Sequence, residues 1–129
     1  MTIVSSEAIQ HILLLDDSED HLEELSRTLE AWGFQVTACL NVAAATSAIQ
    51  TGISFAIVDL FLAGNEGDEL SNGFVVSELL PRGIPFIRMS SAPGLVPAQF
   101  SGLGVYDKRM FRRDRDAFRD YLNVRLSSK

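Results

Sequence analysis

The chain has 129 residues, of which 47% are hydrophobic and 22% charged, and its formal net charge is −6. This length and composition are those of one ordinary globular domain with its own core. No apolar run approaches the ~20 residues that span a bilayer. Residues 1–10 contain Glu7 and lack the basic residues that begin a signal peptide. We therefore expect no signal peptide and a cytoplasmic protein. Cys39 is the only cysteine, which excludes an internal disulfide and a thiolate metal cluster.

The charges are distributed unevenly along the chain. Residues 1–80 contain thirteen acidic residues and one basic residue, whereas residues 81–129 contain four acidic and ten basic residues. The protein therefore has a charge dipole, which affects how partners approach it. The basic part does not require a nucleic acid partner, because Asp114, Asp116 and Asp120 are interleaved with its arginines.

After a lead-in over residues 1–10, five short apolar runs predict the strands of a buried sheet. Short runs rich in branched side chains, without alternation, are typical of strands covered on both faces. The predicted strands are residues 11–16, 35–39, 55–59, 86–90 and 105–108.

Helical patterns separate these strands. Ser18 and Asn41 are suited to N-cap the first two helices, and later helices are expected at about residues 74–80 and 112–126. The segment 92–104 is rich in proline and glycine, so any helix there is short.

This alternation of strands and helices predicts an α/β fold with helices on both faces of a parallel sheet, in three α/β/α layers. Right-handed crossovers leave few topologies. The doubly wound, flavodoxin-like (βα)5 arrangement with strand order 2-1-3-4-5 is the common one at this size. The first and third strands then flank the point where the strand order reverses, which is where such sheets bind ligands.

Acidic residues end the two strands that flank this point. Asp16 and Asp17 follow the first strand and Asp59 ends the third, so parallel pairing brings three carboxylates into one crevice. Their mutual repulsion requires a cation, and an all-oxygen site suits Mg²⁺. His11 and His21 have no matching ligand set, so we expect them to be structural or solvent-facing.

Together with Ser90 after the fourth strand and Lys108 after the fifth, these acids resemble the pattern of response regulator receiver domains in two-component systems, the CheY-like superfamily. The resemblance covers residues 11–126 and rests on four features in order, each at the carboxyl end of a strand. It implies a single receiver domain. Because the chain ends soon after the last predicted helix, we expect no output domain and no DNA-binding domain.

The resemblance also implies a function. The protein would take a phosphoryl group from a histidine kinase or a phosphotransferase protein, and would then change its binding to a downstream protein target. Asp59 is the implied acceptor, assisted by Lys108 and Ser90. Such a protein is a switch and not an enzyme, with at most Mg²⁺-dependent self-phosphorylation and self-dephosphorylation. The implied metal site consists of Asp16, acting through water, Asp17, Asp59 and the backbone carbonyl of Phe61.

Several positions depart from the family pattern. The loop over residues 60–73 is longer than usual, and Ala63 stands where proline is common. Val105 replaces the usual switch aromatic, and Tyr106 should point to the opposite face of the strand. Arg109 replaces the proline that usually follows the lysine, so no cis peptide is expected there. The residues of the phosphorylation site are therefore all present. The aromatic residue and the proline that usually belong to the conformational switch of the family are not.

Three other functions fit parts of the pattern. The main alternative is a receiver-like interaction module that works without phosphorylation. A flavodoxin-type FMN binder has the same topology, but Asp17, Glu19 and Asp20 would repel the FMN phosphate. A haloacid-dehalogenase-type phosphatase normally needs a second acid two residues after its nucleophile, where this chain has Phe61.

The C-terminal part is the expected partner-binding region. In receiver domains the face formed by strand five and the last helix commonly docks partners or a second copy, so a homodimer through this face is one expectation. Tyr106 and Tyr121 can supply aromatic anchors there, and arginine is enriched in protein interfaces. The arginines concerned are Arg109, Arg112, Arg113, Arg115, Arg119 and Arg125. The other interpretation is a solvated helix face with local ion pairs.

Overall fold

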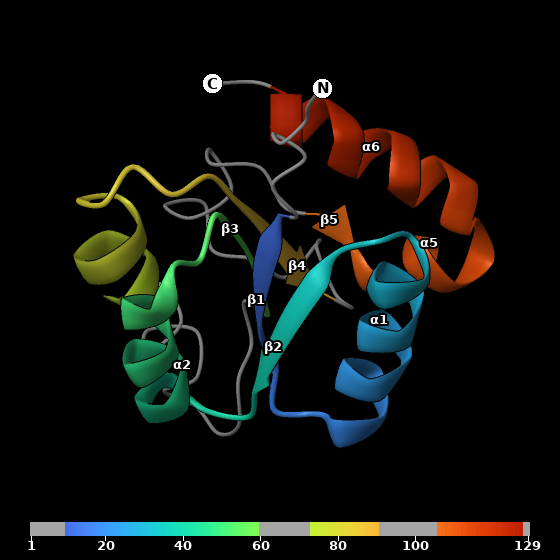
Figure 1. Cartoon of the computed structure of the whole chain (residues 1–129). Coiled ribbons are helices and arrows are strands. Elements are labelled where there is room, and N and C mark those ends of the chain that lie inside the picture. The colour runs from blue at the N-terminus through green and yellow to red at the C-terminus, as the bar shows by residue number, and fades with distance from the viewer. Residues whose placement is uncertain (1–9, 60–72, 91–105, 128–129) are drawn as a thin grey trace.

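A parallel sheet forms the middle layer of the structure, a computed structural model that describes residues 10–59, 73–90 and 106–127 (Figure 1). Five strands lie in the order β2-β1-β3-β4-β5, and every neighbouring pair is parallel. This confirms the expected flavodoxin-like topology. The strands are β1 (His11–Leu15), β2 (Gln35–Cys39), β3 (Phe55–Asp59), β4 (Phe86–Ser90) and β5 (Tyr106–Asp107).

Helical segments cover both faces of this sheet. Where they begin follows from local sequence: the Ser18 side chain accepts a hydrogen bond from the backbone N–H of His21 at 3.2 Å, and the Asn41 side chain accepts one from Ala44 at 2.8 Å. Both predicted caps are therefore confirmed. The segments are α1 (Glu19–Ala31), α2 (Val42–Ala48), the 3₁₀ turn η1 (Ile49–Thr51), the π-helical η2 (Val75–Leu79), α5 (Lys108–Arg113) and α6 (Arg115–Ser127).

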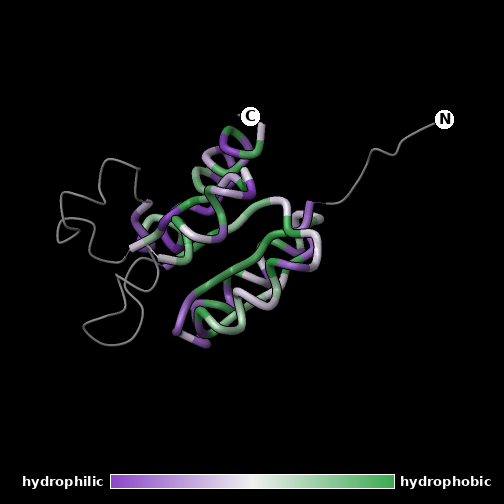
Figure 2. Tube along the Cα trace, turned by 90° about the vertical axis from the view of Figure 1, so that its left-hand side faces the viewer, coloured by the Kyte–Doolittle hydropathy of each residue, from purple (hydrophilic) through white to green (hydrophobic). Residues whose placement is uncertain are grey.

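The core has two halves, one on each face of the sheet. Helices α1, α5 and α6 cover what we call the α1–α6 face, and α2, η1 and η2 cover what we call the α2 face (Figure 1). Figure 2 shows the strands as mainly hydrophobic, whereas the helices alternate between hydrophobic and hydrophilic residues. Successive strand residues point to opposite faces. In β3, Phe55 and Ile57 therefore pack on the α1–α6 face, and Ala56 and Val58 pack on the α2 face.

The C-terminal part differs from the sequence prediction. Strand β5 ends at Asp107, one residue before the predicted end at Lys108, because the Asp107 side chain accepts a hydrogen bond from the backbone N–H of Arg109 at 2.9 Å. That contact starts a helix at Lys108, where the sequence predicted a strand. Asp114 then interrupts the predicted single helix, and its carboxylate accepts a hydrogen bond from the backbone N–H of Ala117 at 3.0 Å. Two capping aspartates thus produce α5 and α6 in place of one helix.

Three further side chains lie in the core or pack against it. Cys39 is buried, with 3% of its surface exposed. Trp32 stacks on Phe118, with ring centroids 6.2 Å apart. Tyr106 packs against the core of the α1–α6 face. Among the described residues, no helix combines the length and apolar character that crossing a membrane requires.

Candidate functional site

The sheet register brings the acidic residues together. Leu15 pairs with Val58, so the residues that follow them, Asp16 and Asp59, lie side by side at the carboxyl edge of the sheet. Carboxylate oxygens of Asp16, Asp17 and Asp59 all lie within 4.8 Å of one another. The predicted convergence of three carboxylates is therefore present.

Two of these three acids are buried. Asp16 and Asp59 are 4% and 5% exposed, whereas Asp17 lies at the surface. At about 5 Å, two carboxylates repel by roughly 3 kcal/mol if the effective dielectric constant is about 20. A cluster of this charge, made of oxygen donors and open to solvent at Asp17, fits a hard divalent cation such as Mg²⁺.

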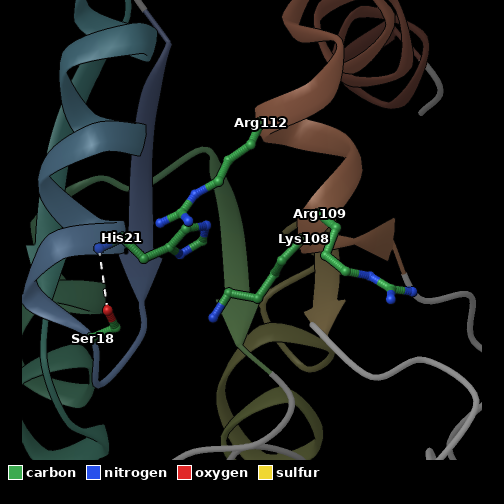
Figure 3. A pocket seen from close by; sticks show the side chains of 5 residues that line it. All are labelled: Ser18, His21, Lys108, Arg109 and Arg112. Atoms are coloured by element: carbon green, nitrogen blue, oxygen red, sulfur yellow. Dashed lines mark hydrogen bonds between the residues drawn. The ribbon is translucent and has the colours of Figure 1, made fainter.

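Lys108 partly neutralises the cluster from the other side of the crevice. Its Nζ lies 2.9 Å from Oδ2 of Asp16 and 3.5 Å from Oδ2 of Asp59. The side chain extends from the first residue of α5, and the neighbouring Arg109 points away from it (Figure 3). Lys108 thus lies beside the implied acceptor, although it begins a helix where a strand residue was predicted.

Both carboxylate oxygens of Asp16 accept hydrogen bonds. Its Oδ1 accepts a hydrogen bond from the backbone N–H of Ser18 at 2.9 Å, and its Oδ2 accepts one from Nδ1 of His21 at 2.5 Å. Burial alone would raise the pKa of Asp16, but the hydrogen bonds from His21, Lys108 and Ser18 outweigh it and hold this pKa below its ordinary value. Asp16 is therefore a stable carboxylate in this setting.

Ser90 ends β4 at the same edge of the sheet and is fully buried. Ser90 follows Met89, which pairs with Asp59 in the neighbouring strand. The Ser90 backbone therefore lies one residue further along the strand direction than the predicted acceptor. The remaining predictions for this site fall on Phe61, Ala63, residues 60–72 of the predicted loop and Val105. These lie outside the described residues.

A pocket of about 180 Å³ adjoins the site between α1 and α5 (Figure 3). The His21 ring reaches into this region from α1, and the Lys108 ammonium group reaches toward it from α5. Much larger volumes, of about 300–1,000 Å³, are usual for pockets that enclose drug-sized ligands. The pocket is lined by Ser18, His21, Lys108, Arg109 and Arg112.

Sequence reasoning missed the roles of two buried residues. His21 was expected to be structural or solvent-facing, and the first alternative fits: it is 5% exposed and bonds directly to Asp16, a contact that the sequence did not indicate. Arg88 is 2% exposed in β4, and burial lowers its pKa because the charged guanidinium loses hydration. Since Ile87 and Met89 face α1–α6, alternation places the Arg88 side chain on the α2 face. A signal for Arg88 was available, namely an arginine inside an otherwise apolar strand.

The C-terminal arginines are engaged mainly with other elements of the same chain. Arg112 and Arg115 both pair with Glu24 of α1, at 3.1 and 2.5 Å. The Arg119 guanidinium lies 5.1 Å from the centre of the Trp32 ring, and Arg125 donates to the backbone carbonyl of Phe86 at 2.6 Å. These contacts hold α5 and α6 against α1 and β4, a function that the predicted local pairing did not include.

Comparisons with known proteins find the same fold. No protein-family model matches the chain, and no curated protein sequence matches it. Solved structures of receiver domains do match. Their sequence identities to this chain are low, so the likeness is one of fold. The non-phosphorylated HemR receiver domain from Leptospira biflexa matches with a TM-score of 0.71 and 21% identity, covering 93% of this chain and 96% of that one.

Two further matches cover nearly the whole chain. A CheY-like response regulator receiver domain protein from Methanospirillum hungatei has a TM-score of 0.65 and 19% identity, covering 95% of this chain and 100% of that one. The response regulator TrrA from Thermotoga maritima, in complex with Mg²⁺-BeF, has a TM-score of 0.65 and 16% identity. That match covers 90% of this chain and 98% of the other. The chain therefore has the CheY-like receiver-domain fold.

Proposed function

We propose that this protein is a phosphoacceptor of a two-component phosphorelay, which takes a phosphoryl group on Asp59. One observation carries the proposal: the Asp59 carboxylate lies at the end of a central strand, within 4.8 Å of two other carboxylates and 3.5 Å from the Lys108 ammonium group. The donor would be the phosphohistidine of a histidine kinase or phosphotransferase protein. The modified protein would then act by binding a downstream protein, as a switch without an enzymatic activity on other substrates.

The acid cluster supplies the ligands for a cation. Asp17 and Asp59 would hold Mg²⁺ directly, and Asp16 would face it through water. The Mg²⁺-BeF complex of the Thermotoga maritima response regulator, which has the same fold, supports Mg²⁺ as the cation. When bound, the ion neutralises charge that develops on the phosphoryl oxygens.

Asp59 and Lys108 have separate tasks in the transfer. A carboxylate oxygen of Asp59 forms a bond to phosphorus while the bond from phosphorus to the donor nitrogen breaks. The bonding electrons leave with the donor imidazole, and the product on this chain is an acyl phosphate. Lys108 can follow the negative charge from the carboxylate to the phosphoryl oxygens, because its flexible side chain ends 3.5 Å from Oδ2 of Asp59. Ser90 would donate a hydrogen bond to one of those oxygens.

Intact-mass analysis after incubation with acetyl phosphate and Mg²⁺ tests the acceptor. The wild type should gain one phosphoryl group, and Asp59→Asn should gain none. Asp107→Asn is a matched control, because Asp107 is also an aspartate at a strand end but caps α5 away from the acid cluster. An adduct that persists in Asp59→Asn would refute the assignment. A wild type without any adduct would favour the alternative function, an interaction module that works without phosphorylation.

Replacing Lys108 tests its catalytic role separately from folding. Lys108→Ala should remain folded, since the side chain contributes charge and not core packing, and it should lose phosphorylation or the conformational response to it. Circular dichroism checks that the variant is folded, and the same mass measurement reports its phosphorylation. Wild-type phosphorylation together with a wild-type response would show that Lys108 has no such role.

A further inference from the structure

We propose that His21 is a positioning residue for the acid cluster. It fixes the Asp16 carboxylate so that Asp16 faces the bound cation through water, which leaves Asp17 and Asp59 as the direct carboxylate ligands. In this way His21 makes the site selective for Mg²⁺ over Ca²⁺. The inference rests on the proposed function, because it concerns the cation of the same site.

The first step is the occupancy of the Asp16 oxygens. Oδ2 accepts a hydrogen bond from Nδ1 of His21 at 2.5 Å and lies 2.9 Å from Nζ of Lys108. Oδ1 accepts a hydrogen bond from the backbone N–H of Ser18 at 2.9 Å. A carboxylate oxygen offers about two acceptor positions, so both positions on Oδ2 are in use. Direct coordination through Oδ2 would require the loss of one of these donors.

The second step is the direction of this hydrogen bond. A carboxylate oxygen can only accept, so Nδ1 of His21 is the donor to Asp16. Nε2 is then left buried, with no hydrogen-bond partner among the described residues. A buried polar atom without a partner is destabilising, and His21 lies beside Phe111 (ring centroids 6.0 Å apart), where an apolar side chain would pack without this penalty. The Nδ1 donor is what a histidine adds at this position.

The third step is why Lys108 does not make His21 redundant. Lys108 Nζ is shared between Asp16 and Asp59, at 2.9 and 3.5 Å. A phosphoryl group on Asp59 would draw this flexible side chain toward its oxygens. His21 has only two side-chain torsions and is buried against Phe111, so it holds Asp16 in place in both states of the site.

The final step links this geometry to the choice of cation. Mg²⁺ keeps several waters and is usually held by one or two carboxylates, whereas Ca²⁺ takes about 6–8 oxygen ligands in flexible geometry. Without His21, Asp16 becomes free to supply a third direct carboxylate. That change favours Ca²⁺ more than Mg²⁺. A hydrogen-bond donor outside the metal ligands therefore sets the selectivity of the site.

Isothermal titration calorimetry with Mg²⁺ and with Ca²⁺ tests the inference on the full chain. Loss of an outer hydrogen-bond partner commonly changes metal affinity by about 10- to 100-fold. We expect His21→Leu to lower the ratio of Mg²⁺ affinity to Ca²⁺ affinity by roughly tenfold. His21→Asn should restore the wild-type ratio, because its side-chain amide places a donor where Nδ1 lies. Should His21→Leu fail to fold, His21→Met carries the same expectation.

Thr28→Val is the matched control. Thr28 is another buried polar residue of α1, and its hydroxyl bonds to the Glu24 carbonyl and Arg115, away from the acids. This change should leave the affinity ratio as in the wild type. An unchanged ratio in His21→Leu, with normal Mg²⁺ binding, would overturn the inference and leave the proposed function standing. A wild type that binds no Mg²⁺ would overturn both.

Discussion

The two faces of the sheet are held to their helices by different kinds of contact. On the α1–α6 face, Phe118 packs against Trp32, Tyr106 and Phe111, with ring centroids 6.2, 5.3 and 5.1 Å apart. Ion pairs from Glu24 add to these contacts. On the α2 face the core is mostly aliphatic. Among the described residues, no ring pair or ion pair joins α2 or η2 to another strand or helix.

This difference bears on the site. Asp59 follows Phe55 and Ile57 in the alternation of β3, so its side chain points toward the α1–α6 face. Both groups that contact Asp16 through side chains, His21 and Lys108, belong to helices of that face. A change of charge at the acids therefore acts on helices that are held by directional contacts, namely ring pairs and ion pairs. The aliphatic packing of the α2 face has no preferred direction.

The largest expected effect on stability comes from removing the ring contacts. Phe118→Ala should lower the free energy of unfolding by about 3–5 kcal/mol, because it removes a fully buried aromatic side chain. Phe74→Ala is the same truncation on the α2 face, and its ring has no aromatic partner among the described residues. Phe74→Ala should therefore lower the free energy of unfolding by about 0.5–1.5 kcal/mol less than Phe118→Ala does, because this is the usual contribution of ring pairs. Urea unfolding measures both, and equal losses would contradict the difference between the faces.

A smaller effect is expected for the ion pairs. Glu24→Gln should lower stability by about 0.5–1 kcal/mol, since it removes the partner of two half-exposed arginines. Glu23→Gln is the control, because Glu23 pairs with Arg27 one helical turn away and with no other described residue, and it should cost about 0.3–0.5 kcal/mol or less. Unfolding in about 1 M NaCl should abolish most of the Glu24 effect, because charges are then screened beyond about 3 Å. A loss that persists at that salt concentration would show that Glu24 acts through packing.

The smallest effect concerns a chemical rate and leaves stability unchanged. Cys39 is buried on the α2 face, and burial raises the pKa of its thiol, so little reactive thiolate is present at neutral pH. Labelling with a thiol reagent should be much slower in the folded protein than in urea. Because no ring pair or ion pair joins α2 or η2 to another strand or helix in the described part of the chain, we expect labelling to follow local opening, so Glu24→Gln should label at the wild-type rate. Faster labelling in that variant would show that the two faces open together.

Most of the sheet follows from the sequence because each strand is a short apolar run with its own boundary residues. The strands at residues 35–39, 55–59 and 86–90 match the prediction. The convergence of Asp16, Asp17 and Asp59 also follows, since it needs only the strand order and the rule that parallel strands end at the same edge. Ser18 and Asn41 are local caps, and local signals of this kind are the ones that a sequence carries most directly.

The rest depends on contacts between distant residues. The hydrogen bond of His21 to Asp16 requires the first turn of α1 to fold back over the end of β1, which a list of metal ligands does not reveal. The start of α5 at Lys108 arises because capping by Asp107 outweighs continuation of the strand. The arginine contacts with Glu24 could not be predicted either, since their partner lies about 90 residues earlier in the chain, on a different helix.

The stacking of Trp32 against Phe118 gives the molecule an optical probe of its own. Trp32 is the only tryptophan in the chain, and its ring contacts both the Phe118 ring and the Arg119 guanidinium of α6. Indole emission depends on hydration and on nearby charge, so displacement of α6 from α1 should shift the emission maximum to longer wavelength. Intrinsic fluorescence therefore follows events on the α1–α6 face without a label. Motion confined to the α2 face should leave this emission unchanged.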